Sequence, residues 1–219
     1  MRILIDSGDS VAIRQALDSG FVAGATTNPT LLRRAGVRAT EVPALAGHAL
    51  EAGAQEVHLQ VYAGDAARMV AEARELAAIH PERIFVKLPA TPAGYRAAAQ
   101  LADEGVRVTL TAVYTLRQAL LAQSVGARYV AIYLGRMRDA GIDSLALAAH
   151  MQMLLNAQGA GVTILAASIR DAEEIVALGL AGVGAATLAP PILGQLLESD
   201  ATAQAAATIG ADARTLFEE

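Results

Sequence analysis

The feature that most constrains the fold of this chain is a pattern that recurs eight times: a short apolar run ends at a polar residue, and a segment of helical periodicity follows. The apolar runs predict strands over residues 2–5, 21–25, 56–61, 83–89, 107–111, 129–133, 163–167 and 183–187. Strands that alternate with helices through short loops form a parallel sheet. Eight such units predict an α/β fold, a (β/α)8 TIM barrel, as a single domain over residues 1–219.

Helices are predicted between the strands and at the end of the chain. Their expected ranges are 10–17, 29–33, 41–52, 65–80, 92–105, 115–125, 144–157 and 171–179, with one more opened by Pro190-Pro191. Residues 201–217 form an amphipathic helix without a partner strand, so residues 199–219 are expected to be a C-terminal extension. An open doubly wound sheet is the alternative fold. It usually carries a glycine-rich turn after its first strand, and Asp6-Ser7-Gly8-Asp9 is no such turn.

Composition limits the class of partner. The net charge is −5 and there is no basic run, which argues against binding to nucleic acid or to an anionic membrane surface. There is no cysteine, which excludes disulfides and thiolate metal sites. Apolar stretches are interrupted before they reach membrane-spanning length, and Met1 leads into the first strand without a signal-peptide pattern. We therefore expect a cytoplasmic protein with a small-molecule partner.

The polar residues that end the strands are the candidate site, because working residues of such barrels lie at the C-terminal ends of strands. In chain order they are Asp6, Asn28, Gln60, Lys87, Thr111, Tyr133, Ser168 and Thr187. The set contains one carboxylate, one amine and a ring of hydroxyl and amide groups. These are the groups that a Schiff-base aldolase needs.

Lys87 is the only lysine of the chain, whereas the other sixteen basic residues are arginines. A desolvated amine can lose its proton and attack a carbonyl carbon, which a guanidinium cannot do. The alternative is a lysine whose stem is buried and whose amine reaches water. Asp6 is expected to move the proton that carbon–carbon cleavage requires, and its alternative role is a structural carboxylate that pairs with Lys87 or caps the first loop.

The remaining candidates are expected to bind substrate or water. Gln60, Thr111 and Tyr133 either hold a water or sugar hydroxyls or only pack in the barrel wall. Arg136, together with Ser168 and Arg170 before a helix N-terminus at Asp171, is expected to form an anion site. The four histidines, His48, His58, His80 and His150, show no metal spacing, so no metal site is predicted. His58 shares a strand face with Gln60 and is expected to be a core histidine.

Several motifs resemble those of the short transaldolase and fructose-6-phosphate aldolase family of class I aldolases. They are Ile5-Asp6-Ser7, Ala25-Thr26-Thr27-Asn28-Pro29-Thr30, Val86-Lys87-Leu88-Pro89, Thr111-Ala112-Val113-Tyr114 and Leu165-Ala166-Ala167-Ser168. The resemblance implies a cofactor-free enzyme in which Lys87 is the nucleophile and Asp6 the acid and base. It also implies substrate-binding roles for Thr27, Asn28, Arg136, Ser168 and Arg170. Ring-shaped homo-oligomers, pentamers or decamers, are implied too, with residues 199–219 reaching a neighbouring subunit.

Two positions distinguish the subgroups of this family. Gln60 and Tyr133 resemble the aldolase type, in which they are implied to hold the catalytic water with Thr111, whereas transaldolases usually carry Glu and Phe. Ile132, Ala189 and Thr109 depart from the family pattern, and Gly135-Arg136 is more similar to the transaldolase form. The expected activity is reversible cleavage of fructose 6-phosphate, or a similar ketose phosphate, to dihydroxyacetone and glyceraldehyde 3-phosphate.

Two alternatives stay open from the sequence. The first is a transaldolase of the pentose phosphate pathway, which transfers the dihydroxyacetone unit from one sugar phosphate to another. The second is a catalytically silent barrel that binds a sugar phosphate.

Overall fold

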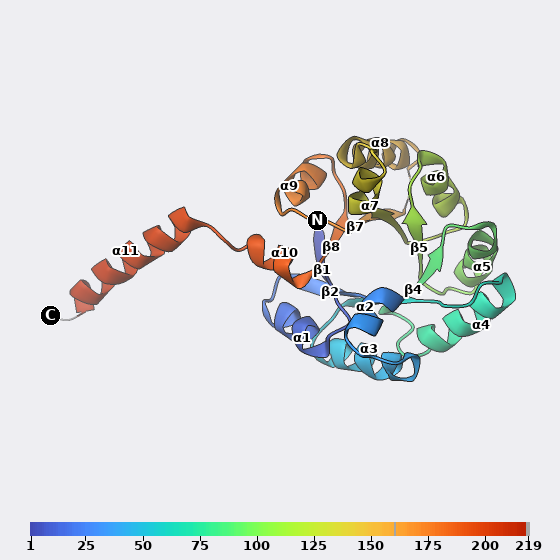
Figure 1. Ribbon diagram of the computed structural model, residues 1–219, viewed down its shortest axis with the longest axis horizontal. Helices are drawn as coiled ribbons and strands as arrows, with labels where there is room; N and C mark the ends of the chain where they lie inside the picture. Colours follow the sequence, from blue (N-terminus) through green and yellow to red (C-terminus); the bar gives the residue numbers. More distant parts are fainter. Residues whose placement is uncertain (160, 218–219) are drawn as a thin grey trace.

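The computed structural model describes residues 1–159 and 161–217 and shows a closed barrel of eight parallel strands, ordered as in the chain. The strands are β1 (Arg2–Asp6), β2 (Val22–Thr26), β3 (Glu56–Gln60), β4 (Ile84–Pro89), β5 (Val108–Val113), β6 (Tyr129–Tyr133), β7 (Thr163–Ala167) and β8 (Ala185–Leu188). Helices alternate with them and surround the barrel (Figure 1). The predicted (β/α)8 barrel is confirmed.

The helices of the outer ring and the shorter helices near the strand ends are as follows: α1 (Ser10–Asp18), α2 (Pro29–Arg34), α3 (Val42–Glu51), α4 (Ala66–Ala77), α5 (Pro92–Asp103), α6 (Leu116–Ser124), α7 (Leu134–Asp139), α8 (Ser144–Ala157), α9 (Glu173–Leu180) and α10 (Pro190–Gln195). A 3-10 turn, η1 (Ala39–Glu41), precedes α3, and α11 (Asp200–Phe217) ends the described chain. In Figure 1, α2 lies inside the outline of the helix ring.

Side-chain caps fix where several helices begin. The carboxylate of Asp65 accepts a hydrogen bond from the backbone N–H of Arg68 at the start of α4. Thr91 accepts one from Gly94 N–H, and Pro92 at the first position of α5 needs no partner because it has no N–H. Each cap satisfies a donor that the helix itself leaves open.

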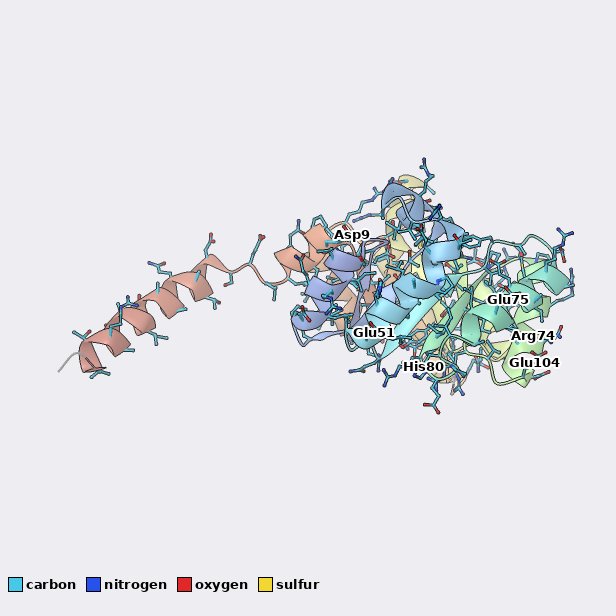
Figure 2. The ribbon with its side chains drawn as sticks, turned by 90° about the horizontal axis from the view of Figure 1, so that it is seen from below. Asp9, Glu51, Arg74, Glu75, His80 and Glu104 are labelled. Atoms are coloured by element: carbon cyan, nitrogen blue, oxygen red, sulfur yellow. The ribbon has the colours of Figure 1, made fainter. Side chains whose placement is uncertain are left out.

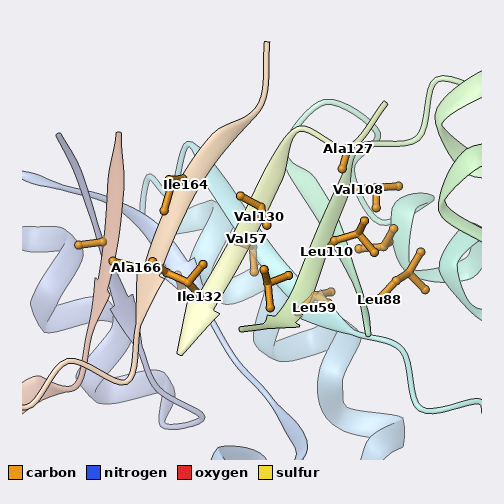
Figure 3. Close-up of a cluster of buried hydrophobic side chains, with 14 of the residues drawn as sticks. Val57, Leu59, Leu88, Val108, Leu110, Ala127, Val130, Ile132, Ile164 and Ala166 are labelled. Carbon is orange, nitrogen blue, oxygen red and sulfur yellow. The ribbon is translucent and has the colours of Figure 1, made fainter. Parts of the chain in front are cut away.

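The alternation of side chains along the strands produces two apolar layers. Outward residues pack between the strands and the helices, and Figure 3 shows part of this layer, including Val57, Leu59, Leu88, Leu110, Val130 and Ile132. Inward residues fill the barrel below the site with Leu4, Phe85, Tyr129, Ala131, Leu165 and Ala185. The barrel interior is therefore a packed core, which also contains the buried polar residues Glu56, His58 and Thr109 below the site.

Several predicted boundaries were wrong by a few residues. The cap of α1 is Asp9 rather than Ser10, because the Asp9 carboxylate accepts from the N–H of Val11 and Ala12. Asp171 accepts from Glu173 N–H in a turn, so α9 begins later than predicted. Strand β8 begins at Ala185 instead of at residue 183.

Helix α7 was not predicted. It has only six residues, which is too short for a periodic pattern to show, and the burial of Leu134 and Met137 holds it in place.

Helix α11 extends away from the barrel (Figure 2). Its apolar residues Ile209 and Leu216 are 69% and 78% exposed. The outer helices of the barrel, in contrast, are joined to one another, for example by the ion pair between Arg74 of α4 and Glu104 at the end of α5 (Figure 2). Among the described residues, no helix has the length and apolarity that crossing a membrane requires.

Candidate active site

A cavity of about 460 Å³ opens at the C-terminal ends of the strands. It is lined by Asp6, Asn28, Pro29, Thr30, Leu31, Arg34, Gln60, Lys87, Pro89, Thr111, Ala112, Ala131, Tyr133, Arg136, Leu165, Ala167, Ser168 and Thr187. Eight of the ten residues predicted for the site are in this lining, and Thr27 and Arg170 are not. The strand ends therefore bring most of the predicted groups to one mouth, as a parallel barrel requires.

Lys87 lies on β4 with its side chain inside the barrel and is only 5% exposed. Its Nζ donates a hydrogen bond of 2.9 Å to the backbone oxygen of Thr27. Burial lowers the pKa of the amine from its usual 10.5, and the negative charge of Asp6 opposes that shift. The lysine is thus buried to its amine, which rules out the alternative of an amine that reaches bulk water.

Thr27 contributes its backbone rather than its side chain. Its carbonyl holds the Lys87 amine, while its buried hydroxyl has no hydrogen-bond partner among the described residues. The residue lies beside the cavity at the end of β2. Its main-chain oxygen orients the amine beneath the mouth.

Asp6 ends β1 and is partly exposed in the cavity. Burial raises the pKa of its carboxyl above the usual 3.8, whereas the charge of Lys87 and a hydrogen bond from Thr26 work in the opposite direction. No ion pair joins Asp6 to Lys87 in the part of the chain that the structure describes. The carboxylate and the amine therefore line the same cavity without an ion pair between them.

Gln60 lies on β3, next to the strand of Lys87, and Tyr133 lies on β6, two strands away. Gln60 pairs with Lys87 in the register of β3 and β4, and its Nε2 donates to the backbone oxygens of Lys87 at 3.0 Å and of Val61 at 3.2 Å. With both donors of the amide used, its carbonyl oxygen remains as an acceptor for a group in the cavity. The hydroxyls of Thr111 and Tyr133 lie 2.6 Å apart. Burial raises the pKa of Tyr133, so this phenol stays protonated and keeps a proton to donate.

Arg136 is the cation that α7 brings to the mouth. Its guanidinium lies 5.2 Å from the centroid of the Tyr133 ring, which restrains it over the cavity. The first turn of α7 fits closely against the residue that follows β7: Gly135 N–H donates to Ser168 O, and a Cβ at Gly135 would lie 2.7 Å from the Ser168 hydroxyl oxygen. Only glycine allows this approach, and it places Arg136 and Ser168 side by side.

Arg170 lies outside the cavity lining and is engaged elsewhere. Its two terminal nitrogens donate to the carboxylate of Asp139 at 2.7 and 2.5 Å. Glu174 of α9 accepts from Arg138 and from the Arg170 N–H. These bonds attach α7 to the start of α9. In this structure Arg170 therefore holds the segment that carries Arg136, and it does not itself face the cavity.

Two polar residues of the site, Arg34 and Thr26, were not predicted, and Thr187 was predicted only as a strand end without a role of its own. Arg34 lies on α2 and lines the mouth as a second guanidinium. Thr26 pairs with Asp6 in the register of β1 and β2, and its hydroxyl oxygen lies 2.7 Å from that of Thr187. Thr26 stands within a motif that was recognised, but only the barrel register shows that its side chain points inward beside Asp6. Arg34 directly follows Arg33 on a short helix, and nothing in the sequence indicates which of the two faces the cavity.

Ala112 lines the cavity with a φ of 57°, in the left-handed region that non-glycine residues rarely adopt. The register of β5 against β6 shifts between Leu110 and Val113. Strained backbone of this kind is concentrated at functional sites, where the surrounding structure enforces it.

His58 lies one layer below the site and is fully buried. Its Nδ1 is 2.9 Å from the Thr109 hydroxyl, and its ring stacks on Phe85 with a centroid distance of 4.7 Å. Burial lowers its pKa, so the ring is neutral. The expectation of a core histidine agrees with this position.

A family profile and individual relatives both match this chain over most of its length. The profile of the family described as transaldolase/fructose-6-phosphate aldolase matches residues 3–219. A probable transaldolase of Heliobacterium modesticaldum is 36% identical over 202 residues, which are 92% of each chain. Another, of Thermus thermophilus, is 37% identical over 215 residues, covering 92% of this chain and 93% of the relative.

Solved structures with a similar fold are more distant. A mandelate oxidase aligns with a TM-score of 0.64 at 14% identity over 88% of this chain. A mutant flavocytochrome b2 aligns with a TM-score of 0.65 at 11% identity over 88% of this chain. The chain spans only 65% and 58% of those two proteins. At such identities the likeness shows the barrel fold alone.

Proposed function

The chain belongs to the transaldolase/fructose-6-phosphate aldolase family and is an enzyme of the aldolase or transaldolase type, and from this premise we propose that it is the aldolase. The proposed reaction is reversible cleavage of fructose 6-phosphate, or a similar ketose phosphate, to dihydroxyacetone and glyceraldehyde 3-phosphate. The observation that carries the proposal is the surroundings of Lys87: a neutral amide, Gln60, and the Thr111–Tyr133 hydroxyl pair lie at its side of the cavity.

In the first step, the neutral amine of Lys87 attacks the C2 carbonyl of the ketose. Burial favours the neutral, nucleophilic form of this amine. The carbinolamine then loses water and becomes an iminium. In this proposal the oxygen of Gln60 and the hydroxyls of Thr111 and Tyr133, which line the cavity, hold this water.

In the second step, the carboxylate of Asp6 takes the proton of the C4 hydroxyl. The C3–C4 bond breaks, its electron pair passes to the iminium, and an enamine forms while the aldehyde leaves. Protonation of the enamine at C3 and hydrolysis release the ketone and restore the Lys87 amine. No oxidant or reductant enters this sequence.

The phosphate of the substrate is proposed to bind at the rim of the cavity. Arg136 and Arg34 line the rim, and neither has an ion-pair partner among the described residues. The Ser168 hydroxyl lies beside the turn before Arg136. Two guanidinium groups and a hydroxyl suit a dianionic phosphate.

The test is reduction of the protein with borohydride in the presence of fructose 6-phosphate or dihydroxyacetone, followed by mass spectrometry. The chain has a single lysine, so an intact-mass adduct can form only on Lys87 or on the terminal amine. We expect an adduct that is located on the Lys87 peptide and absent from Lys87→Arg. If neither ligand labels the protein under conditions that label a known class I aldolase, the catalytically silent barrel replaces this proposal.

Transaldolase is the second candidate, because Gly135-Arg136 is similar to the transaldolase form and the curated relatives carry that name. In that reaction the enamine waits for an acceptor aldose phosphate instead of a proton. Incubation with fructose 6-phosphate alone separates the two. An aldolase releases dihydroxyacetone continuously, whereas a transaldolase stops after one equivalent until an acceptor such as erythrose 4-phosphate is added.

We further propose a homo-oligomer, a pentamer or decamer, located in the cytoplasm. The exposed apolar residues of α11 support a role for residues 199–219 in contact with a neighbouring copy.

A further inference from the structure

A chain of two hydroxyl groups ends at the Asp6 carboxylate. Strand β1, which carries Asp6, lies between β2 and β8, and those two strands contribute Thr26 and Thr187. The Thr26 hydroxyl is 2.6 Å from Asp6 Oδ1 and 2.7 Å from the Thr187 hydroxyl. Both threonines are buried, with 1% and 3% of their surface exposed. Bulk water therefore competes little for these bonds.

The number of protons fixes the direction of the chain. A carboxylate has no proton, so the single proton of the Thr26 hydroxyl must be donated to Asp6. The Thr26 oxygen can then only accept from Thr187, which donates. A donor that itself accepts a hydrogen bond is polarised toward its acceptor, and bonds to a charged group are the stronger kind.

The two oxygens of Asp6 are therefore not equivalent. Oδ1 is held by Thr26, while Oδ2 accepts no hydrogen bond from any residue in the described part of the chain. A proton on Oδ1 would force the hydroxyl of Thr26, and then that of Thr187, to reverse. A proton on Oδ2 disturbs neither hydroxyl.

We propose that Thr26 and Thr187 are positioning residues that fix Oδ1 of Asp6 and leave Oδ2 as the oxygen that exchanges the substrate proton. This inference rests on the proposed aldolase function of the same site. In the cleavage step, the C4 hydroxyl proton passes to Oδ2 as the C3–C4 bond breaks, and it leaves from Oδ2 afterwards. Thr187 also lines the cavity, and in this scheme both threonines act through Asp6.

The charged and titratable groups near Asp6 are few. Lys87 on β4 favours the ionised carboxylate, and the phenol of Tyr133 on β6 lies close enough to feel the charge of Asp6. Thr26 is the group that bonds the carboxylate directly and lowers its pKa against the effect of burial. Removal of the Thr26 hydroxyl alone should therefore change the pKa of the Asp6 carboxyl by a measurable amount.

The experiment measures the Asp6 carboxyl pKa by carbon NMR titration, with the resonance identified by its loss in Asp6→Asn. We expect Thr26→Val to raise this pKa by about one unit, and Thr187→Val to raise it less. Thr26→Ser should restore the value of the wild type. Thr27→Val is the matched control, since the Thr27 hydroxyl has no partner among the described residues and the Asp6 pKa should stay in place.

The variants Thr26→Val and Thr187→Val are also tested by steady-state kinetics. We expect Thr26→Val to lower kcat about 10-fold with little change in KM and to move the acid limb of the pH profile upward. Adding Thr187→Val to Thr26→Val should have no further effect, because the chain is already broken. Independent, additive effects, or an unchanged Asp6 pKa in Thr26→Val, would overturn the proposal. Thr187→Val leaves the direct partner of Asp6 intact and serves if Thr26→Val does not fold.

The NMR titration does not depend on turnover. If borohydride traps no adduct and the Asp6 pKa still responds as expected, the aldolase function fails while the positioning of Asp6 stands. If an adduct forms and the pKa does not respond, the aldolase function stands and the positioning role is withdrawn.

Discussion

At the scale of single residues, burial disfavours the charged forms of both ionisable groups of the site, the Lys87 amine and the Asp6 carboxyl. Burial lowers the pKa of the Lys87 amine and raises that of the Asp6 carboxyl, and the charge of each group partly opposes the shift of the other. A nucleophilic amine needs this environment, but burial of the two ionisable groups lowers the free energy of unfolding. The burial that activates Lys87 is therefore expected to reduce the stability of the folded protein.

The first prediction follows from that opposition. The variant Asp6→Asn/Lys87→Met should be inactive and more stable than the wild type by about 1–4 kcal/mol near neutral pH. Its advantage should shrink as the pH rises through the folded-state pKa of Lys87 toward 10.5, where the unfolded amine also becomes neutral. It should shrink likewise as the pH falls toward 3.8, where Asp6 is protonated in both states. Urea unfolding at a series of pH values measures this, and a constant or negative difference would contradict it.

The second prediction concerns the two adjacent arginines of α2. Both arginines are exposed, but only Arg34 belongs to the described lining of the cavity. Arg34→Ala should raise KM for fructose 6-phosphate about 10-fold and leave trapping of dihydroxyacetone unchanged, because only the former carries a phosphate. Arg33→Ala is the matched control and should change neither. If the two variants raise KM equally, the arginines act only through their positive charge near the mouth, and Arg34 makes no specific contact with the phosphate.

At the scale of elements, α2 joins stability to the site. Asn28 caps this helix with its Oδ1, which accepts from the N–H groups of Thr30 and Leu31 at 3.0 and 3.1 Å. The amide nitrogen of Asn28 makes no bond to a described residue, and Asn28 lines the cavity. One side chain thus holds the helix with one atom and offers a donor to the substrate with another.

The third prediction separates these two roles. Asn28→Ser keeps a capping oxygen but loses the amide donor, so stability should stay within about 0.5 kcal/mol of the wild type while kcat/KM falls at least about 10-fold. Asn28→Ala should lose a similar amount of activity and, in addition, about 1 kcal/mol of stability. Thermal unfolding and steady-state kinetics of both variants check this. Full activity in Asn28→Ser would leave Asn28 with the cap alone.

At the scale of the whole molecule, the barrel and α11 differ in how they are held. The barrel closes on itself, with each strand paired to two neighbours. Helix α11 projects from it and exposes Ile209 and Leu216, which lie seven residues apart and so on one face of the helix. A face of this kind is buried when another chain packs against it.

The fourth prediction tests α11 as an assembly element. Removal of residues 200–219 should leave the barrel folded and reduce the mass measured by light scattering to that of a smaller oligomer or a monomer. Ile209→Asp/Leu216→Asp should act in the same direction, while Ala207→Asp, on the opposite helix face, should leave the mass unchanged. An unchanged mass in the truncated chain would remove α11 from the assembly.

The repeated strand and helix pattern was sufficient to predict the barrel, and the strand ends were sufficient to predict most of the cavity lining. This worked because side-chain alternation and parallel pairing force strand-end residues to one rim. Helix boundaries were less secure, since α7 is too short to show a period and Asp9 competed with Ser10 for the cap. Arg170 could not be placed from sequence, because its partner Asp139 lies on that unpredicted helix.

The repeated pattern of the chain was enough to predict the barrel and to bring Lys87 and Asp6 to one mouth. The choice between the two adjacent arginines, and the contact through which Arg170 braces α7, required the three-dimensional arrangement. The same holds for the contact between Thr26 and Thr187 beside Asp6, because these two residues are 161 positions apart in the chain. The physical reason is that local pattern fixes which face of a strand or helix a residue occupies, whereas hydrogen-bond partners depend on register and on closure of the barrel.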